Sequence, residues 1–332
     1  MSRNKELDYL SISARIHAME TRLLNSERLD RMIDARDLSD TAKVLAECGY
    51  GELSEVSASG VEELLAQAQA DLFQDLGSAV KNRPLLDVFR CKYDYHNAKV
   101  LVKAEALGIE EDRLLLGGGR YDRKALAESY RREDLRSCSE TLRKGIARAR
   151  EVLGATGDPQ QADFVLDHAY YEELTLLAQE AESKFLQDYV ALQIDVANLR
   201  AAVRASRLGK GPEFLSQVLV PGGTVSVHTL AYARGEELGG LFQSGLLSEA
   251  AAEGAAKSVP GSGPLTEFER LCDNAVMEYV GAGRRVPFGE QPVIGYLHAR
   301  EAETIAIRII VSGRLAGLDG NTIRQRLRRT YG

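Results

Sequence analysis

An acid and an amide three residues apart occur at two well-separated places in the sequence. Asp94 and Asn97 form one pair, and Asp195 and Asn198 form the other. Beside an apolar helix stripe, such a pair can fix the register of a helix–helix contact through buried hydrogen bonds, or it can bind a polar ligand. The first interpretation is the simpler one, and the second stays open.

The two pairs lie at equivalent places in an internal repeat. Residues 94–108 align without gaps against residues 195–209, and a fainter third copy spans residues 303–317 with Ala306 in place of the amide. The copies lie about a hundred residues apart, a spacing that indicates three divergent copies of one structural unit. The repeat positions are Asp94, Asn97, Lys99, Gly108, Asp195, Asn198, Arg200, Gly209, Glu303, Arg308 and Gly317.

A helical wheel gives the first copy a physical meaning. The apolar residues share one face, the acid and the amide border that face, and the basic residues Lys99 and Lys103 point away from it. The apolar face is formed by Phe89, Tyr93, Val100 and Leu107. The glycine that closes each copy is expected to end the helix as a C-cap. We expect Lys99, Arg200 and Arg308 to be exposed charges or a threefold set of contacts.

Common motifs for enzyme chemistry are absent from the sequence. It has no Walker A loop, no dinucleotide-binding glycine motif, no H-E-x-x-H and no G-x-S-x-G. The histidines are far apart, and the four cysteines form no C-x-x-C pair, so we expect reduced, buried thiols. Acidic pairs fall in predicted helix starts or loops. We therefore predict no catalytic residue, no metal site and no cofactor.

Charge is balanced overall but locally basic at the C-terminus. A formal net charge of −7 argues against a nucleic-acid partner. Residues 323–331 read as a basic amphipathic helix, whose arginines form a solvated face or dock on an acidic partner. The candidates for a partner interface are Lys103, Arg204, Arg324, Arg328 and Tyr331.

The elements that position these residues are predicted to be helices, so the fold class is all-α. Ser39 is expected to cap a helix that ends at Gly49, Ser59 with Glu62 to form a capping box, and Pro84 to open a helix that ends near Gly108. We divide the chain into repeats at 1–116, 117–212 and 213–332. The last contains a Gly/Ala-rich insertion, 221–264, in which we expect short helices.

Targeting signals are absent from the sequence. Residues 1–10 are charged and precede no apolar run, so we expect no secretory signal and a cytoplasmic location. The longest uncharged stretch, 214–233, is interrupted by Pro221 and two glycines and fails as a membrane span.

With these motifs in view, the sequence resembles the C subunit of the rotary A/V-type ATPases, the family that includes the d subunit of the eukaryotic V-ATPases. Three segments carry the resemblance most clearly: 93–103, 292–317 and the closing stretch 323–331. Segments 9–24, 167–171 and 265–273 resemble other landmarks of the family, so the resemblance runs nearly full length.

The resemblance implies a funnel of three similar helical subdomains in a pseudo-threefold arrangement. Such a funnel would sit on the cytoplasmic face of the membrane proteolipid ring, receive the central shaft and transmit torque without a catalytic site. The choice between protons and sodium ions would lie in the ring proteins. The alternatives are a generic helical-repeat scaffold with an unrelated partner and a helical enzyme with an unrecognised site.

Overall fold

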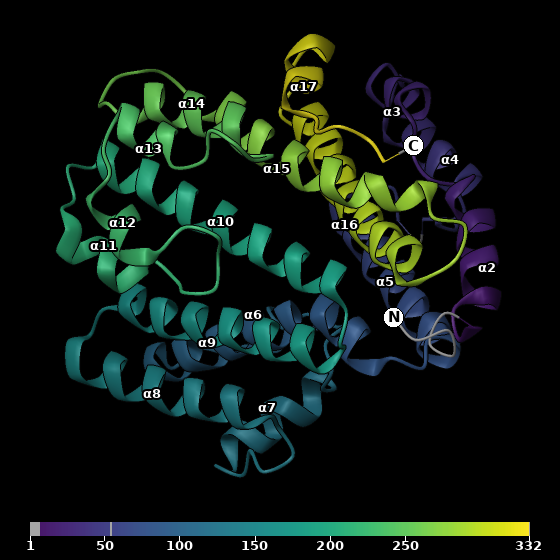
Figure 1. Cartoon of the computed structure of the whole chain (residues 1–332). Helices are drawn as coiled ribbons and strands as arrows, with labels where there is room; N and C mark the ends of the chain where they lie inside the picture. The colour runs from purple at the N-terminus through teal and green to yellow at the C-terminus, as the bar shows by residue number, and fades with distance from the viewer. Residues whose placement is uncertain (1–6, 54, 332) are drawn as a thin grey trace. The chain divides into compact units, whose positions relative to one another are not determined.

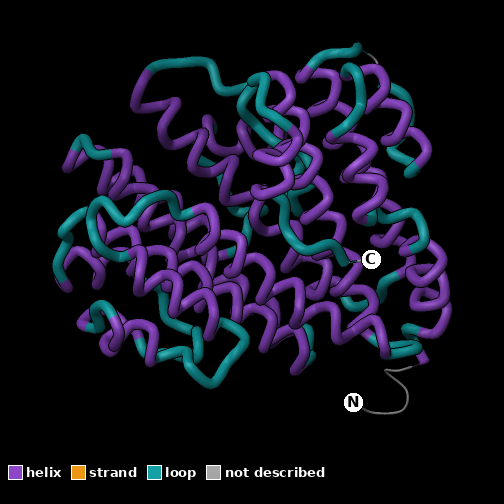
Figure 2. The backbone as a smooth tube through the Cα atoms, turned by 90° about the horizontal axis from the view of Figure 1, so that it is seen from above, coloured by secondary structure: helices purple, strands orange, loops and turns teal. Residues whose placement is uncertain are grey.

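The structure is a computed structural model that describes residues 7–53 and 55–331. All regular elements within these ranges are helices, and none of these residues forms a strand (Figure 2). The predicted all-α class is confirmed. The N-terminal charges Arg3, Lys5 and Glu6, on which the expectation of no secretory signal depends, lie outside the described residues.

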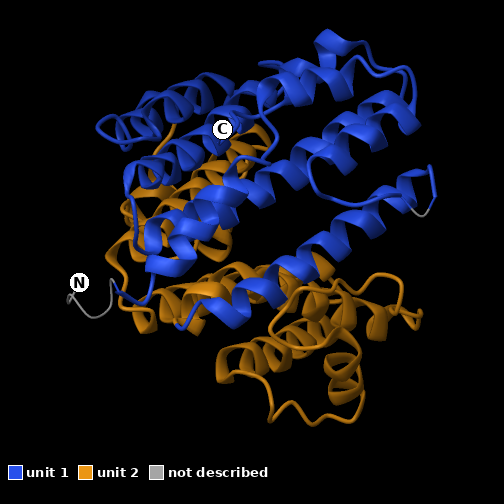
Figure 3. Cartoon of the chain, turned by 90° about the vertical axis from the view of Figure 1, so that its right-hand side faces the viewer, with its two compact units in different colours: residues 1–81, 235–332 blue, residues 82–234 orange. Residues whose placement is uncertain are grey.

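The chain forms two compact units, residues 1–81 with 235–332 and residues 82–234 (Figure 3). The helices of the first unit are α2 (Leu10–Glu20), α3 (Ser26–Ile33), α4 (Leu38–Glu47), α5 (Ala58–Ala79), α13 (Glu236–Gly240), α14 (Ser248–Lys257), α15 (Thr266–Gly281), the 3-10 helix η1 (Ala282–Arg285), α16 (Glu290–Leu315) and α17 (Gly320–Arg326). The helices of the second unit are α6 (Arg83–Leu107), α7 (Arg123–Arg131), α8 (Glu140–Thr156), α9 (Pro159–Glu180), α10 (Lys184–Arg207), α11 (Pro212–Val218) and α12 (Val227–Tyr232). The division into three repeats stays a prediction.

Helix α16 organises the first unit. It contacts α2, α3, α5, α15 and α17, so segments from both ends of the chain pack on one long helix. Its buried residues Ile307, Ile310 and Val311 form one apolar cluster with Leu45 and Met32 of α4 and α3. Burying apolar side chains of this size is the main force that holds the helices together.

Helix α9 is the centre of the second unit. It lies between α8 and α6, which run beside it in Figure 1, and it also contacts α10. Gly145 of α8 permits a close approach, because a Cβ there would lie 2.9 Å from the Cβ of Ala169. Phe89 of α6 stacks on Tyr189 of α10 with ring centroids 5.5 Å apart.

The observed helix ends can be compared with the capping residues that the sequence predicted. Helix α6 begins with Arg83 and Pro84 and ends at a left-handed Gly108, as predicted. The predicted caps of α4 and α5 were each two residues late, because Asp37 and Ser57 accept the capping hydrogen bonds instead of Ser39 and Ser59. The short helices expected in region 221–264 are present as α12, α13 and α14.

The predicted helix over 323–331 is too long, because α17 ends at Arg326 and residues 327–331 have no regular secondary structure. Tertiary contacts explain the difference. Arg284 donates to the carbonyl oxygen of Tyr331 at 2.6 Å, and the Tyr331 ring packs against Gly295, where a Cβ would clash with it. These contacts draw the segment onto η1 and α16, which a continued helix could not reach.

The four cysteines are buried free thiols, as predicted. In the part of the chain that the structure describes, no helix combines the length and the apolar character that crossing a membrane requires.

Candidate functional site

The acid of the first repeat copy holds a loop. Asp94 is buried in α6, and its carboxylate accepts the backbone N–H of Arg120 at 3.0 Å and that of Tyr121 at 3.4 Å. The Arg120 guanidinium adds a charged hydrogen bond through Nε at 2.6 Å. One carboxylate therefore fixes the loop that joins α6 to α7, and charged hydrogen bonds of this kind are among the strongest.

The amide of the same copy, three residues after the acid on α6, holds the loop at a second point. Asn97 Oδ1 accepts the backbone N–H of Leu116 at 2.8 Å, and Asn97 Nδ2 donates to the Leu116 carbonyl at 2.9 Å. A carboxamide is the side chain whose shape matches both groups of one peptide unit. We call the acid, the amide and the loop backbone that they bind a clamp.

Arg120 extends the first clamp into a buried ionic network. Its Nη1 donates to Glu173 of α9 at 2.6 Å, and the Tyr95 hydroxyl donates to the other oxygen of Glu173 at 2.8 Å. Burial raises the pKa of Asp94 to about 6, although Arg120 opposes the shift. Burial alone would also raise the pKa of Glu173, but the hydrogen bond and charge of Arg120 hold that pKa below its usual range. The guanidinium thus keeps two buried carboxylates ionised.

The second copy repeats the clamp without the cation. Asp195 of α10 accepts the backbone N–H of Thr224 at 2.9 Å and its hydroxyl at 2.6 Å. Asn198 Nδ2 donates to the carbonyl of Val220 at 2.8 Å, and Asn198 Oδ1 accepts the Val220 N–H at 2.9 Å. A threonine stands where the first copy has Arg120, so this clamp is built largely from uncharged donors.

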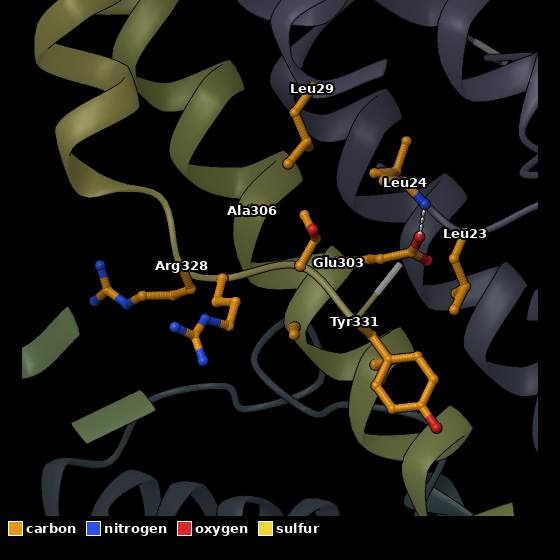
Figure 4. A pocket seen from close by; sticks show the side chains of 11 residues that line it. Leu23, Leu24, Leu29, Glu303, Ala306, Arg328 and Tyr331 are labelled. Carbon is orange, nitrogen blue, oxygen red and sulfur yellow. Dashed lines mark hydrogen bonds between the residues drawn. The ribbon is translucent and has the colours of Figure 1, made fainter. Parts of the chain in front are cut away.

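The third copy holds a different segment. Glu303 of α16 is buried and accepts the backbone N–H of Leu24, as Figure 4 shows. It also accepts the Tyr50 hydroxyl at 2.8 Å and Arg300 Nη1 at 2.9 Å. Burial raises the pKa of Glu303 despite Arg300. Ala306, which replaces the amide, lines a pocket instead, together with leucines of the N-terminal region and the C-terminal segment 328–331.

The repeat glycines end their helices in one way. Gly108, Gly209 and Gly317 all have φ between 62° and 70°, which L side chains rarely adopt. In each copy the N–H of the next residue bonds a carbonyl five residues back, as from Ile109 to Ala104 at 3.1 Å and from Lys210 to Ala205 at 2.9 Å. The predicted C-caps are present in all three copies.

The predicted role of the acid and amide needs one correction. In the first two copies they fix a helix–loop contact and not the register between two helices. Arg120 and Thr224 were not predicted. Glu173, a member of one of the acidic pairs expected on the surface at helix starts or loops, is instead buried inside α9. A signal for the loops exists, because a gapped extension of the repeat aligns Leu115 to Gly119 with Leu219 to Gly223 and matches the glycine pair at the end.

The glycine at the end of each loop permits the close approach. A Cβ on Gly119 would lie 2.3 Å from Asp94 Oδ1, and a Cβ on Gly223 would lie 2.2 Å from Asp195 Oδ1. Both positions therefore need glycine for space, because its hydrogen atom leaves room for the carboxylate.

We expect Gly119→Ala to lower the free energy of unfolding by about 1–3 kcal/mol, because the methyl group forces the loop off the carboxylate. Urea unfolding of the full chain measures the change. Gly117→Ala is the matched control in the same glycine run, since no atom lies within 4 Å of a Cβ at that position. Equal effects of the two substitutions would contradict the close-approach argument.

Two of the basic repeat positions make ion pairs within their own unit. Lys99 Nζ lies 2.6 Å from Asp167, and Arg308 Nη2 lies 2.7 Å from Glu62. Arg200 is half-buried on α10 and also makes polar interactions. Lys99 and Arg200 belong to the second unit and Arg308 belongs to the first.

The interface candidates also have contacts inside the chain. Lys103 pairs with Asp163 at 3.0 Å, and Arg328 pairs with Asp273 at 2.6 Å. Arg324 bridges Asp30 and Asp34, Tyr331 is buried, and Arg204 is exposed and makes interactions of its own. A partner would therefore compete with internal ion pairs at most of these positions.

The side chains of the clamps have a structural role. Each repeat carboxylate is buried and accepts several donors from the protein. Glu303 also lines the pocket beside Ala306, but backbone and side-chain donors already bind both of its oxygens. Within residues 7–53 and 55–331, no cluster of three or more His, Cys, Asp or Glu side chains could hold a metal ion. The arrangement fixes loops to helices.

Fold and site together define a class: all-helical proteins with internal repeats, in which buried acids and amides hold backbone segments to long helices. The chain belongs to the ATP synthase (C/AC39) subunit family, whose model matches residues 12–326. This family is the C subunit of the V/A-type ATPases, a non-catalytic part of the complex.

Curated relatives match the chain over nearly its full length. It is 22% identical to the C subunit of the V-type sodium ATPase of Enterococcus hirae, with 98% of this chain and 99% of the relative covered. It is 26% identical to the C subunit of the V-type ATP synthase of Thermus thermophilus, with 94% and 95% covered. It is 25% identical to the C subunit of the A-type ATP synthase of Methanocaldococcus jannaschii, with 96% and 86% covered.

Proposed function

We propose that this chain is the central-stalk connector of a V/A-type ATPase, joining the membrane proteolipid ring to the central shaft and transmitting torque between them. The observation that carries the proposal is the end-to-end match to these relatives, in which almost no part of the chain or of the relatives is left over. The proposed location is the cytoplasmic face of the membrane, reached through the other subunits.

The clamps support a mechanical role. A part that transmits torque must resist deformation, and its loops are the segments that deform most readily. In the second unit, buried hydrogen bonds tie the loops after α6 and α10 to those helices at two points each. A scaffold for an unrelated partner would gain the same rigidity, but family membership favours ATPase subunits as the partners.

Co-purification tests the connector directly. The tagged chain, expressed in its native host and extracted in mild detergent, should recover both the proteolipid ring and the shaft subunits. Recovery of the chain alone, or with ATPase subunits that include neither ring nor shaft, would contradict the proposal.

The interface candidate Arg324 is tested in the same experiment. We expect Arg324→Gln to reduce recovery of the partners if its guanidinium leaves Asp30 and Asp34 to bind an acidic partner. Deletion of residues 324–331 is a poorer test, because it also removes the buried Tyr331 and the Arg328–Asp273 pair. The control is Arg31→Gln, whose side chain is comparably exposed in the same unit and pairs with Glu47. If both variants recover the partner subunits equally well, Arg324 does not contribute to the interface.

A further inference from the structure

The segment that follows α6 exposes large apolar side chains. Leu107 is 67% exposed, Ile109 and Leu114 are each 50% exposed, and Leu116 is 40% exposed. Single exposed leucines are ordinary, whereas several within ten residues indicate an interaction surface. We call residues 107–116 the apolar loop.

The first clamp holds the apolar loop in place. The loop runs back along α6, because Leu116 is bound to Asn97 by both backbone groups and the Leu114 carbonyl lies 3.1 Å from His96 Nε2. Ten residues of helix separate Asn97 from Leu107, so the exposed side chains are spread over roughly 15 Å. A loop ordered before binding loses little conformational entropy when a partner docks.

The second repeat copy lacks such a surface at the equivalent place. There the chain forms α11, which buries Leu215 and packs Phe214 on Phe164 with ring centroids 5.8 Å apart. Among the described residues 208–220, a single large apolar residue is exposed, and it is Leu208, the counterpart of Leu107. The apolar loop therefore has no counterpart in the second copy and does not follow from the repeat alone.

Carboxylates border the apolar loop. Residues 105–116 contain Glu105, Glu110, Glu111 and Asp112 against one arginine, Arg113. Arg150 pairs with Glu105, and Arg131 pairs with Glu111 and Asp112. The outward negative charge therefore comes mainly from Glu110, which is exposed, and from Asp112, whose side chain is 81% exposed. An acidic border is repelled by anionic lipid headgroups and attracts a partner with basic side chains.

We propose that the apolar loop is a docking surface for another subunit of the ATPase, one that presents apolar side chains bordered by lysine or arginine. This proposal rests on the proposed function, because it takes the partner from the same complex. Leu114 and Leu116, which the first clamp holds beside α6, are the apolar side chains that we expect to contribute most to binding.

Site-specific photo-crosslinking in the assembled complex tests the surface. A photoreactive phenylalanine analogue at position 114 or 116 should crosslink to one ATPase subunit, whose contact peptide contains apolar and basic residues. The same analogue at the exposed Leu208 is the matched control and should not give that product. Crosslinks to lipid, to a second copy of this chain, or to no partner in a complex that is otherwise intact would overturn the proposal.

Binding measurements give the second arm. Leu114→Ser combined with Leu116→Ser should reduce the fraction of complexes that contain this chain by about tenfold or more, while Leu208→Ser leaves it unchanged. Thermal unfolding of the free variants checks that the chain still folds. A crosslink to a subunit other than ring or shaft would support the docking surface, and it would count against the connector only if the wild-type chain also failed to recover ring and shaft. If the wild-type chain recovers ring and shaft but the loop variants leave the fraction of complexes that contain this chain unchanged, the docking surface is contradicted and the connector stands.

Discussion

Replacing Arg120 with leucine should lower the free energy of unfolding of the chain by about 3–5 kcal/mol, the largest effect that we expect of a single substitution. The guanidinium is nearly buried and binds both Asp94 and Glu173 at 2.6 Å. Its removal leaves two buried carboxylates close together with no cation. Chemical denaturation at pH 7 measures the loss.

The pH dependence of this variant has a defined sign. Without the guanidinium, burial and mutual repulsion raise the pKa of Asp94 and of Glu173 in the folded state above their unfolded values. A carboxyl whose folded pKa is raised favours the folded state while protonated, and this contribution is lost as the pH rises through that pKa. The loss of stability caused by Arg120→Leu should therefore be smaller at pH 5 than at pH 7.

A surface arginine in the same unit provides the control. Arg148 of α8 is mostly exposed and pairs with Glu151 one helical turn away. Leucine and arginine have similar helix propensities, so Arg148→Leu should change the stability by no more than about 0.5 kcal/mol at either pH. Comparable effects at positions 120 and 148, or a deficit that does not depend on pH, would show that the buried network is not the cause.

Asn198→Ala should lower the free energy of unfolding by about 2–4 kcal/mol, the second largest effect that we expect. Asn198 and Val220 are both buried, and the amide satisfies the N–H and the carbonyl of Val220 together. Alanine leaves both backbone groups without a partner and away from water, which is the costly case. Hydrogen exchange of the Val220 amide should accelerate in the variant together with the loss of stability.

The first repeat copy supplies the comparison for this prediction. Asn97→Ala removes the same two hydrogen bonds, but Leu116 is partly exposed, so water can reach its backbone groups. We expect a smaller loss of stability there. If Asn97→Ala proved more damaging than Asn198→Ala, desolvation of the loop backbone would not be the controlling factor.

Local signals made much of the fold predictable. Helical periodicity, Pro84 at the start of α6 and Gly108 at its end depend on neighbouring residues, because helix geometry and caps are short-range properties. The predicted repeat also located Asp94, Asn97, Asp195 and Asn198, which are the centres of the clamps. Their burial was underestimated, since the wheel put them at the border of the apolar face while Leu107 in fact points to solvent.

The clamp partners could not be predicted in the same way. Arg120 and Glu173 are 53 residues apart and meet only because α9 packs beside α6. The Thr224 hydroxyl plays part of the role of Arg120 in the second copy, and no pattern of residue types reveals that a neutral group replaces a cation. Such contacts depend on how the helices pack, which periodicity does not encode.

Residue types and spacings along the chain were enough to predict an all-helical fold, to indicate an internal repeat and to carry the resemblance to the C subunit of the rotary ATPases. They could not reveal that the repeat acids and amides hold loops, or that the C-terminal segment leaves its helix to pack on α16. Those outcomes depend on hydrogen bonds and packing between residues far apart in the sequence, whose energies exist only once the helices have come together.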